Sequence, residues 1–432
     1  MKALEPEDAA THQSTQRRTL LTLSLAAFAS QASVRLCDPM LPQLAKELDH
    51  AIGEVAYVIT SFSIAYGLFQ LVHGPMGDYA GKLRWIRYAT IAAAIASAAC
   101  MLAMNLPQLL ALRFIAGAAC AALIPLSLAW IGDSVAYDHR QAVLARLMTG
   151  STAGAVFGQV AGGIMADTLG WRLSFALPAI VLAIVAVLLT LDTRRFVQLS
   201  ADLDASTLNT SSSLRGANDP SISLGAYQGV NGPRPSFFAI ATQFGSVLRI
   251  SWARIILMVV FLEGLLVYSA FAYVPSYLHL QYHLSLWQAG LAAAGFGIGG
   301  VCYSLAASYL IRSLGERGLL VGGASLFALG MFCVGGPLWT VQLMYCTLMG
   351  LGFFMVHNTL QVQATQMSPQ ARGTGIAAFA AGLFSGQSIG VAIGSPVLTR
   401  FGFEILQMAS ASLLLLLGAS MAYLLGRRLN QP

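Results

Sequence analysis

The chain has 432 residues, of which 56% are hydrophobic and only 10% are charged. Soluble domains usually carry about a quarter charged residues, so this composition excludes an ordinary soluble enzyme and a disordered chain. It predicts a polytopic α-helical membrane protein, because a transmembrane helix needs about 20 mostly apolar residues. The net charge of +6 does not indicate nucleic acid as a partner, since the basic residues flank apolar segments, where they set membrane topology.

Apolar runs bounded by charged or turn residues predict twelve transmembrane helices in chain order. They span residues 19–43, 55–76, 85–104, 108–132, 144–166, 173–191, 253–278, 286–311, 318–338, 341–365, 373–397 and 403–425. The first run is long and lacks a small-residue cleavage site, so we expect a retained helix and not a secretory signal.

Residues 192–250 interrupt this pattern, because they are rich in Ser, Asn, Gly and Pro and have too little apolar surface to fold alone. A short amphipathic helix on the membrane surface is predicted within them at Phe237–Leu248. The predicted divisions are a tail at 1–18, a six-helix bundle at 19–191, a cytoplasmic linker at 192–250, a second bundle at 251–426 and a tail at 427–432.

The positions of the 24 Lys and Arg residues predict the orientation. With a cytoplasmic N-terminus and alternating helices, the outer loops hold only Lys46, Arg172 and Arg400, and two more arginines lie within helices. Basic residues accumulate in cytoplasmic loops. We therefore expect a multi-pass protein of the cell membrane, or of the inner membrane if it is bacterial, with both termini cytoplasmic.

A glycine pattern in the fifth predicted helix recurs in the eleventh at an offset of 232 residues. Gly150, Gly154, Gly158 and Gly162 correspond to Gly382, Gly386, Gly390 and Gly394. A glycine at every fourth position makes a smooth helix face that allows close packing. We expect these faces to pack at contacts between the two halves. A parallel repeat of six helices is typical of transporters with a site between two halves, so the predicted fold is all-α, with twelve transmembrane helices in two pseudo-symmetric bundles.

Four ionisable residues lie inside predicted helices, where a charge is costly and marks a functional site; they are Arg35, Asp38, Arg113 and Glu263. Arg35 and Asp38 are spaced to share one helix face and pair. Pro39 and Pro42 are expected to interrupt that helix. No cation lies within four positions of Glu263 to stabilise its charge. We therefore expect burial to dominate and to disfavour its charged form. We predict that Glu263 binds and releases the proton, with Asp38 and Arg113 taking part in the coupling.

Polar and aromatic residues on other helices complete the predicted substrate cavity. His357, Asn358 and Gln361 fall on one helical face and are candidates to contact a polar ligand. The alternative is that they make hydrogen bonds between helices, and that the tyrosines only pack. The predicted cavity consists of Arg35, Asp38, Tyr66, Arg113, Glu263, Tyr268, His357, Asn358 and Gln361.

Three segments resemble motifs of the major facilitator superfamily. The loop GPMGDYAGKLR at Gly74–Arg84 is similar to the signature between helices 2 and 3 of that family. Arg113 and Gly117 resemble its helix-4 motif, whose arginine is linked to proton relay. The stretch GSTAGAVFGQVAGG resembles its antiporter motif, with Gln159 where proline is usual. The chain thus resembles the twelve-helix drug/proton antiporter branch.

The resemblance implies proton-coupled efflux of small organic molecules by alternating access. It also implies a cytoplasmic gate, in which the acid of the signature forms a charge cluster that holds the cytoplasmic side closed; the gate residues here are Gly74, Asp78, Gly81, Lys82 and Arg84. The alternatives are a proton-coupled importer of a metabolite or organic anion, and a non-transporting membrane sensor or scaffold.

The remaining expectations concern chemistry and partners. The sequence has no phosphate-binding glycine loop and no catalytic constellation, and its six cysteines form no CxxC pair. We therefore expect no enzymatic activity, cofactor or metal site. The expected partners are a small-molecule substrate, protons and the lipid bilayer, with no nucleic acid, and the expected state is a monomer.

Overall fold

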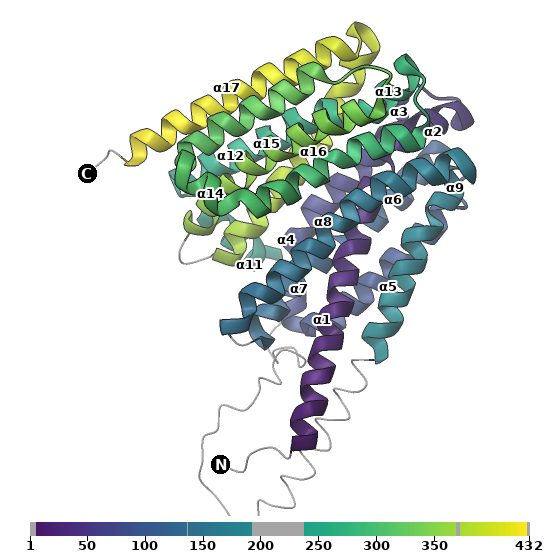
Figure 1. Ribbon diagram of the computed structural model, residues 1–432. Helices are drawn as coiled ribbons and strands as arrows, with labels where there is room; N and C mark the ends of the chain where they lie inside the picture. The colour runs from purple at the N-terminus through teal and green to yellow at the C-terminus, as the bar shows by residue number, and fades with distance from the viewer. Residues whose placement is uncertain (1–5, 136, 192–236, 369–371, 430–432) are drawn as a thin grey trace, which may run out of the picture.

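The computed structural model describes residues 6–135, 137–191, 237–368 and 372–429. Within these ranges the regular structure is helical and no strand occurs (Figure 1). The prediction of an all-α membrane fold is confirmed, because nine helical stretches of the described residues are long and apolar enough to cross a membrane.

We call the helices up to residue 191 the N-terminal group. It consists of α1 (Pro6–Arg35), the 3-10 helix η1 (Asp38–Met40), α2 (Leu41–Leu48), α3 (Ile52–Val55), α4 (Tyr57–Ala80), α5 (Lys82–Cys100), α6 (Leu106–Cys120), α7 (Leu123–Ser134), α8 (Tyr137–Thr168), α9 (Trp171–Ser174) and a helix that continues to residue 191.

We call the helices from α11 onward the C-terminal group. It consists of α11 (Phe237–Leu248), α12 (Ser251–Phe271), α13 (Val274–Tyr282), α14 (Leu286–Cys333), α15 (Trp339–Gln366), α16 (Arg372–Phe401) and α17 (Phe403–Leu429).

The predicted spans coincide with these helices, and their ends differ by several residues. The long α14 contains two predicted spans, which are divided at Gly315, where φ is 62°. Only glycine adopts such a conformation readily, so the chain turns there although the helical assignment continues. The helix predicted at Phe237–Leu248 is present as α11. The rest of the predicted linker, residues 192–236, lies outside the described residues, and the linker stays a prediction there.

The two glycine faces pack within the groups, so the expected contacts between halves were wrong for these faces. A Cβ atom at Gly158 would lie 2.8 Å from the Cα of Ala32 on α1, and one at Gly390 would lie 2.8 Å from the Cα of Leu265 on α12. Real Cβ atoms do not approach so closely. Glycine is therefore needed on α8 to approach α1, and on α16 to approach α12.

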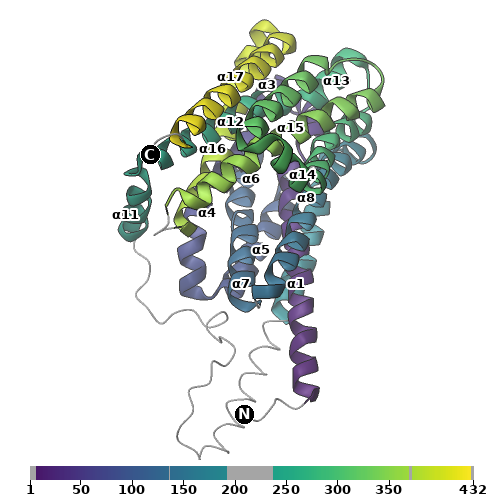
Figure 2. The ribbon, with the colours of Figure 1, turned by 60° about the vertical axis from the view of Figure 1, so that its left-hand side comes forward.

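The two groups meet through other residues, at the end of the molecule that carries α2, α3 and α13. The Thr60 hydroxyl of α4 donates to the Ser388 carbonyl of α16 at 3.3 Å, and the Ser388 hydroxyl donates to the Thr60 carbonyl at 2.9 Å. On the neighbouring pair of helices, the backbone N–H of Trp287 donates to the Asp167 carboxylate at 2.8 Å. The groups diverge toward the opposite end, where α7 and α11 lie (Figures 1 and 2).

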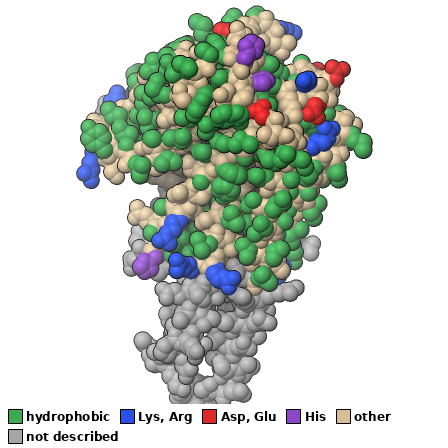
Figure 3. Space-filling view, turned by 45° about the vertical axis from the view of Figure 1, so that its right-hand side comes forward, with side chains coloured by type: hydrophobic (Ala, Val, Ile, Leu, Met, Phe, Trp, Pro, Cys, Tyr) green, Lys and Arg blue, Asp and Glu red, His purple; other side chains and the backbone are tan. Residues whose placement is uncertain are grey.

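The surface agrees with a membrane environment. Hydrophobic side chains cover the flank of the molecule, and charged side chains gather toward its two ends (Figure 3). Such a wide apolar belt is costly in water but suits lipid.

Candidate functional site

The first ionisable pair lies where α1 is interrupted, as the two prolines predicted. The helix ends at Arg35, and the short η1 that follows begins at Asp38. Arg35 Nη1 lies 3.6 Å from Asp38 Oδ2, and the amide of Gln159 on α8 donates to the same oxygen at 3.4 Å. The Asp38 side chain is almost wholly buried, whereas 11% of the Arg35 side chain is exposed. The pair is thus fixed on the N-terminal group with its cation at the accessible side.

Arg35 also joins the two groups. Its guanidinium carbon lies 4.3 Å from the centre of the Tyr268 ring on α12. A cation over an aromatic face is attracted by the ring quadrupole, and the attraction grows when both are withdrawn from water. Tyr268 is buried. The contact therefore links the Arg35–Asp38 pair to the helix that carries Glu263.

Arg113 on α6 is buried, with 1% of the residue exposed. Its guanidinium donates to the Ser33 carbonyl at 3.1 Å and lies 4.1 Å from the centre of the Phe62 ring. No carboxylate of the described residues pairs with it. Its charge is therefore held by a carbonyl and an aromatic ring within the N-terminal group.

Glu263 has a partner that sequence spacing did not reveal. Its side chain is fully buried on α12, and its Oε2 lies 3.0 Å from Nδ1 of His357 on α15. No cation lies within four sequence positions of Glu263, but in space its carboxylate contacts a histidine from another helix. His357, which was predicted to contact substrate, is brought into direct contact with the predicted proton site.

The other predicted cavity residues are placed differently from one another. Tyr66 is buried with its hydroxyl 3.4 Å from that of Ser30, and its ring lies 4.4 Å from the Phe384 ring of the C-terminal group. The Asn358 amide donates to the Phe354 carbonyl of its own helix at 2.9 Å. Gln361 is exposed. Tyr66 therefore lies at the contact between groups, while the Asn358 amide forms its hydrogen bond within its own helix.

Two of the residues predicted to belong to the gate lie in a charge cluster at the turn from α4 to α5, within the N-terminal group. Lys82 Nζ lies 2.9 Å from Asp78 and 2.7 Å from Asp133 at the end of α7. Burial disfavours the charge of Lys82, but the hydrogen bonds to Asp133 and Asp78 outweigh it and raise the Lys82 pKa above its ordinary value. Sequence reasoning missed Asp133. An acid at the end of the apolar α7 is the only signal that the sequence carries for it.

The remaining gate residues have distinct local roles. Gly81 ends α4 with φ of 86°, a conformation that L side chains rarely adopt. Gly74 has no atom within 4 Å of the position where a Cβ would lie, and Arg84 is exposed. The structure therefore explains Gly81 by its backbone and Lys82 by its partners, and offers no packing reason for the glycine at 74.

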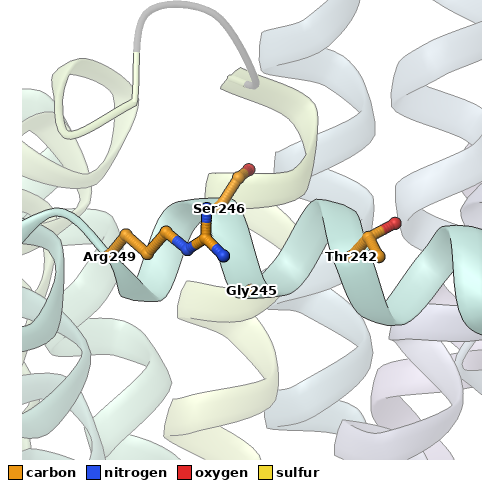
Figure 4. Close-up of a pocket in the computed structure, with 4 residues that line it drawn as sticks. All are labelled: Thr242, Gly245, Ser246 and Arg249. Atoms are coloured by element: carbon orange, nitrogen blue, oxygen red, sulfur yellow. The ribbon is translucent and has the colours of Figure 1, made fainter.

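A pocket lies along α11, on the side of the molecule where the groups diverge. Its described lining residues are Thr242, Gly245, Ser246 and Arg249 (Figure 4). These described lining residues include no predicted cavity residue and no carboxylate. We therefore assign it no part in the site described above.

Comparison with known proteins gives a family match over most of the chain. A sequence profile described as Major Facilitator Superfamily matches residues 23–391. The multidrug export protein EmrB of Escherichia coli (strain K12) is 29% identical over 175 residues, which are 40% of this chain and 34% of EmrB. The MFS-type transporter YceJ of Bacillus subtilis (strain 168) is 22% identical over 372 residues, which are 83% of each protein. The match thus spans about a third of the length of EmrB but most of YceJ.

Solved structures share the fold at low sequence identity. The nucleoside transporter NupG superposes with a TM-score of 0.68 at 14% identity, over 94% of this chain and 98% of that one. A bacterial homologue of the human lysosomal transporter Spinster, in an inward-facing and unoccupied conformation, gives a TM-score of 0.67 at 16% identity, over 98% of both chains. At these identities the likeness concerns the fold alone.

Proposed function

The chain belongs to the Major Facilitator Superfamily, and from that membership we propose that it exports small organic molecules in exchange for protons. It is a multi-pass membrane protein of a transporter family, which is not a class of enzymes. Relatives named as a multidrug export protein and as a probable multidrug resistance protein support efflux. The substrate, the direction and the proton coupling are parts of the proposal.

The observation that carries the proposal is a site divided between the two groups of helices. The Arg35–Asp38 pair belongs to one group, the Glu263–His357 pair belongs to the other, and Tyr268 contacts Arg35 across the boundary. When the groups rock against each other, the surroundings of both acids change. Binding that prefers one protonation state and one conformation couples substrate and proton movements.

The conformation supports alternating access. The groups are joined by hydrogen bonds at the α2–α3–α13 end and diverge at the opposite end. If both termini are cytoplasmic, as the basic residues predict, this is a state open to the cytoplasm. Cysteines placed at Asp49 and at Ser212 test that orientation. We expect an impermeant thiol reagent to label position 49, and not position 212, in intact cells; the reverse result would invert the topology.

Proton flux in proteoliposomes tests the function. A pH-sensitive dye is enclosed with purified protein, and a panel of compounds that includes ethidium as a cation and fluorescein as an anion is added outside. Exchange predicts that entry of a substrate drives protons out and makes the interior alkaline. Acidification would mean symport and would support the importer. Absence of flux with every compound in the panel would support the sensor or scaffold.

A further inference from the structure

Glu263 is separated from water by the rest of the C-terminal group. Its side chain is 0% exposed, and Oε1 has no hydrogen-bond partner among the described residues. Its other oxygen faces Nδ1 of His357, whose side chain keeps 14% of its surface exposed. Of the two side chains, only that of the histidine is exposed. A proton therefore reaches Glu263 in this conformation by way of the imidazole.

Two aromatic rings fix the orientation of that imidazole. The Phe353 ring lies 5.2 Å from it, centre to centre, at an interplanar angle of 11°, and the Phe379 ring of α16 lies at 5.3 Å and 39°. Such packing restricts rotation of the imidazole. Nδ1 is held toward Glu263, while no described residue forms a hydrogen bond with Nε2. The ring therefore has one nitrogen at the buried acid and the other free to meet a proton donor.

We propose that His357 relays protons to and from Glu263, so that the pair and not Glu263 alone is the coupling unit. The inference rests on the proton exchange proposed above. In the loading step a proton binds Nε2, the N–H bond at Nδ1 breaks, and that proton binds Glu263 Oε2, which leaves a neutral imidazole and a neutral carboxyl. In the opposite conformation the same transfers run backward, and Nε2 releases the proton on the other side. Imidazole suits this work because its ordinary pKa lies near neutrality.

Few other ionisable residues lie close enough to exchange a proton with Glu263 in place of His357. On α12 the nearest ionisable residue is Tyr268, beyond which lie Arg35 and Asp38 of the other group. On α14, Glu316 accepts a hydrogen bond from Gln363, which lies further along α15. The charged residues on α16 and α17 are in terminal turns: Arg372, Arg400, Glu404, Arg427 and Arg428. No described acid or base other than His357 contacts Glu263.

The relay is tested with His357→Gln, Glu263→Gln and, as a matched control, His279→Gln, and with a rescue experiment on His357→Ala. Glutamine keeps a hydrogen-bond donor at position 357 but cannot carry a proton. His279 belongs to the same group, but its Nδ1 lies 2.7 Å from the backbone carbonyl of Leu284. Each variant is reconstituted and measured for proton-driven transport across a range of pH, and for counterflow of labelled ethidium or fluorescein without a pH gradient.

The relay predicts a specific pattern. His357→Gln should lose proton-driven transport by about 100-fold, far more than it loses counterflow, and the pH profile of the remainder should flatten. In His357→Ala, added imidazole should restore the rate, and it should fail to do so when Glu263→Gln is also present. His279→Gln should keep the wild-type profile.

Two results would overturn the relay while leaving the proposed exchange intact. One is a wild-type pH profile in His357→Gln, and the other is a loss of counterflow together with proton-driven transport, which would place His357 in substrate binding. Absence of proton flux in the wild-type protein would instead overturn the proposed exchange itself, and the relay with it.

Discussion

The packing of α1 on α8 and that of α12 on α16 are nearly the same construction, used twice. On α8 the glycines lie against the backbone of Phe28, Ala32 and Leu36, and on α16 the corresponding glycines lie against Phe261, Leu265 and Ser269. Each partner residue recurs at an offset of 233. The repeat that the sequence showed as glycine spacing is therefore a repeat of helix contacts.

The chemistry of the two regions is not repeated. At the same offset, Glu263 corresponds to Ser30, whose hydroxyl lies near that of Tyr66, and Asp38 corresponds to Phe271, which packs on Phe296. Among the residues whose burial is described, each group thus carries one buried acid, at a position that the repeat does not relate to the other and with a different partner. The comparison teaches that the scaffold is symmetric while the ionisable residues are not, which lets the two acids perform different tasks.

The largest expected effect comes from disrupting the close helix packing that both groups share. Gly158→Leu and Gly390→Leu should each destabilise the protein by about 3 kcal/mol, because the new side chain would meet the Cα atom of Ala32 or Leu265. The measurement is the fraction of monodisperse protein that survives a heating series. Gly132→Ala is the control, since nothing lies within 4 Å of its added Cβ. Normal stability of either leucine variant would mean that its helix pair does not need the close approach.

The next effect separates the two acids. Glu263→Gln mimics the protonated carboxyl at nearly constant volume, and it should abolish proton-driven accumulation while leaving counterflow measurable. Asp38→Asn should instead weaken substrate binding or gating, because it leaves the largely buried Arg35 without its anion. Both variants are assayed for accumulation under an imposed pH gradient and for counterflow.

The opposite pattern would reverse the assignment. If Glu263→Gln accumulates substrate as well as wild type while Asp38→Asn does not, Asp38 is the coupling acid. The asymmetry between the groups would remain, with the roles exchanged.

The sequence predicted the helices and the buried charges well, because apolar length and isolated charges are local signals. It placed the helix ends less well, since polar turns extend α1 back to Pro6 and α8 back to Tyr137. The glycine pattern indicated a smooth face but not which helix would pack on it. Helical spacing also could not reveal His357 beside Glu263, 94 residues away, or Gln159 beside Asp38, 121 residues away.

A smaller effect is expected at the contact between the groups. Tyr268→Leu removes the ring beneath Arg35. It should weaken the contact between the groups by about 2 kcal/mol and so favour opening of the closed end, which carries α2, α3 and α13. The conformational equilibrium would shift by about 30-fold toward the state in which that end is open. Tyr268→Phe keeps the ring and should shift it little. Labelling of a cysteine at position 392, near the closed end of α16, reports the population. Equal labelling of both variants would show that the Arg35 contact does not hold the groups together.

The smallest effect is expected from shortening the predicted linker, because the two groups already contact each other through their helices. Hydrogen bonds between helices join the groups, for example between α4 and α16 and between α8 and α14. The linker composition predicts no packed core, and the closure cost of a loop changes only slowly with its length. Removing Ser206–Val230, which lies outside the described residues, should therefore leave expression and transport within about twofold of wild type. Transport by the shortened protein in proteoliposomes is the measurement. Loss of folding would mean that this segment docks on the helices, and that the two groups are not joined by their helix contacts alone.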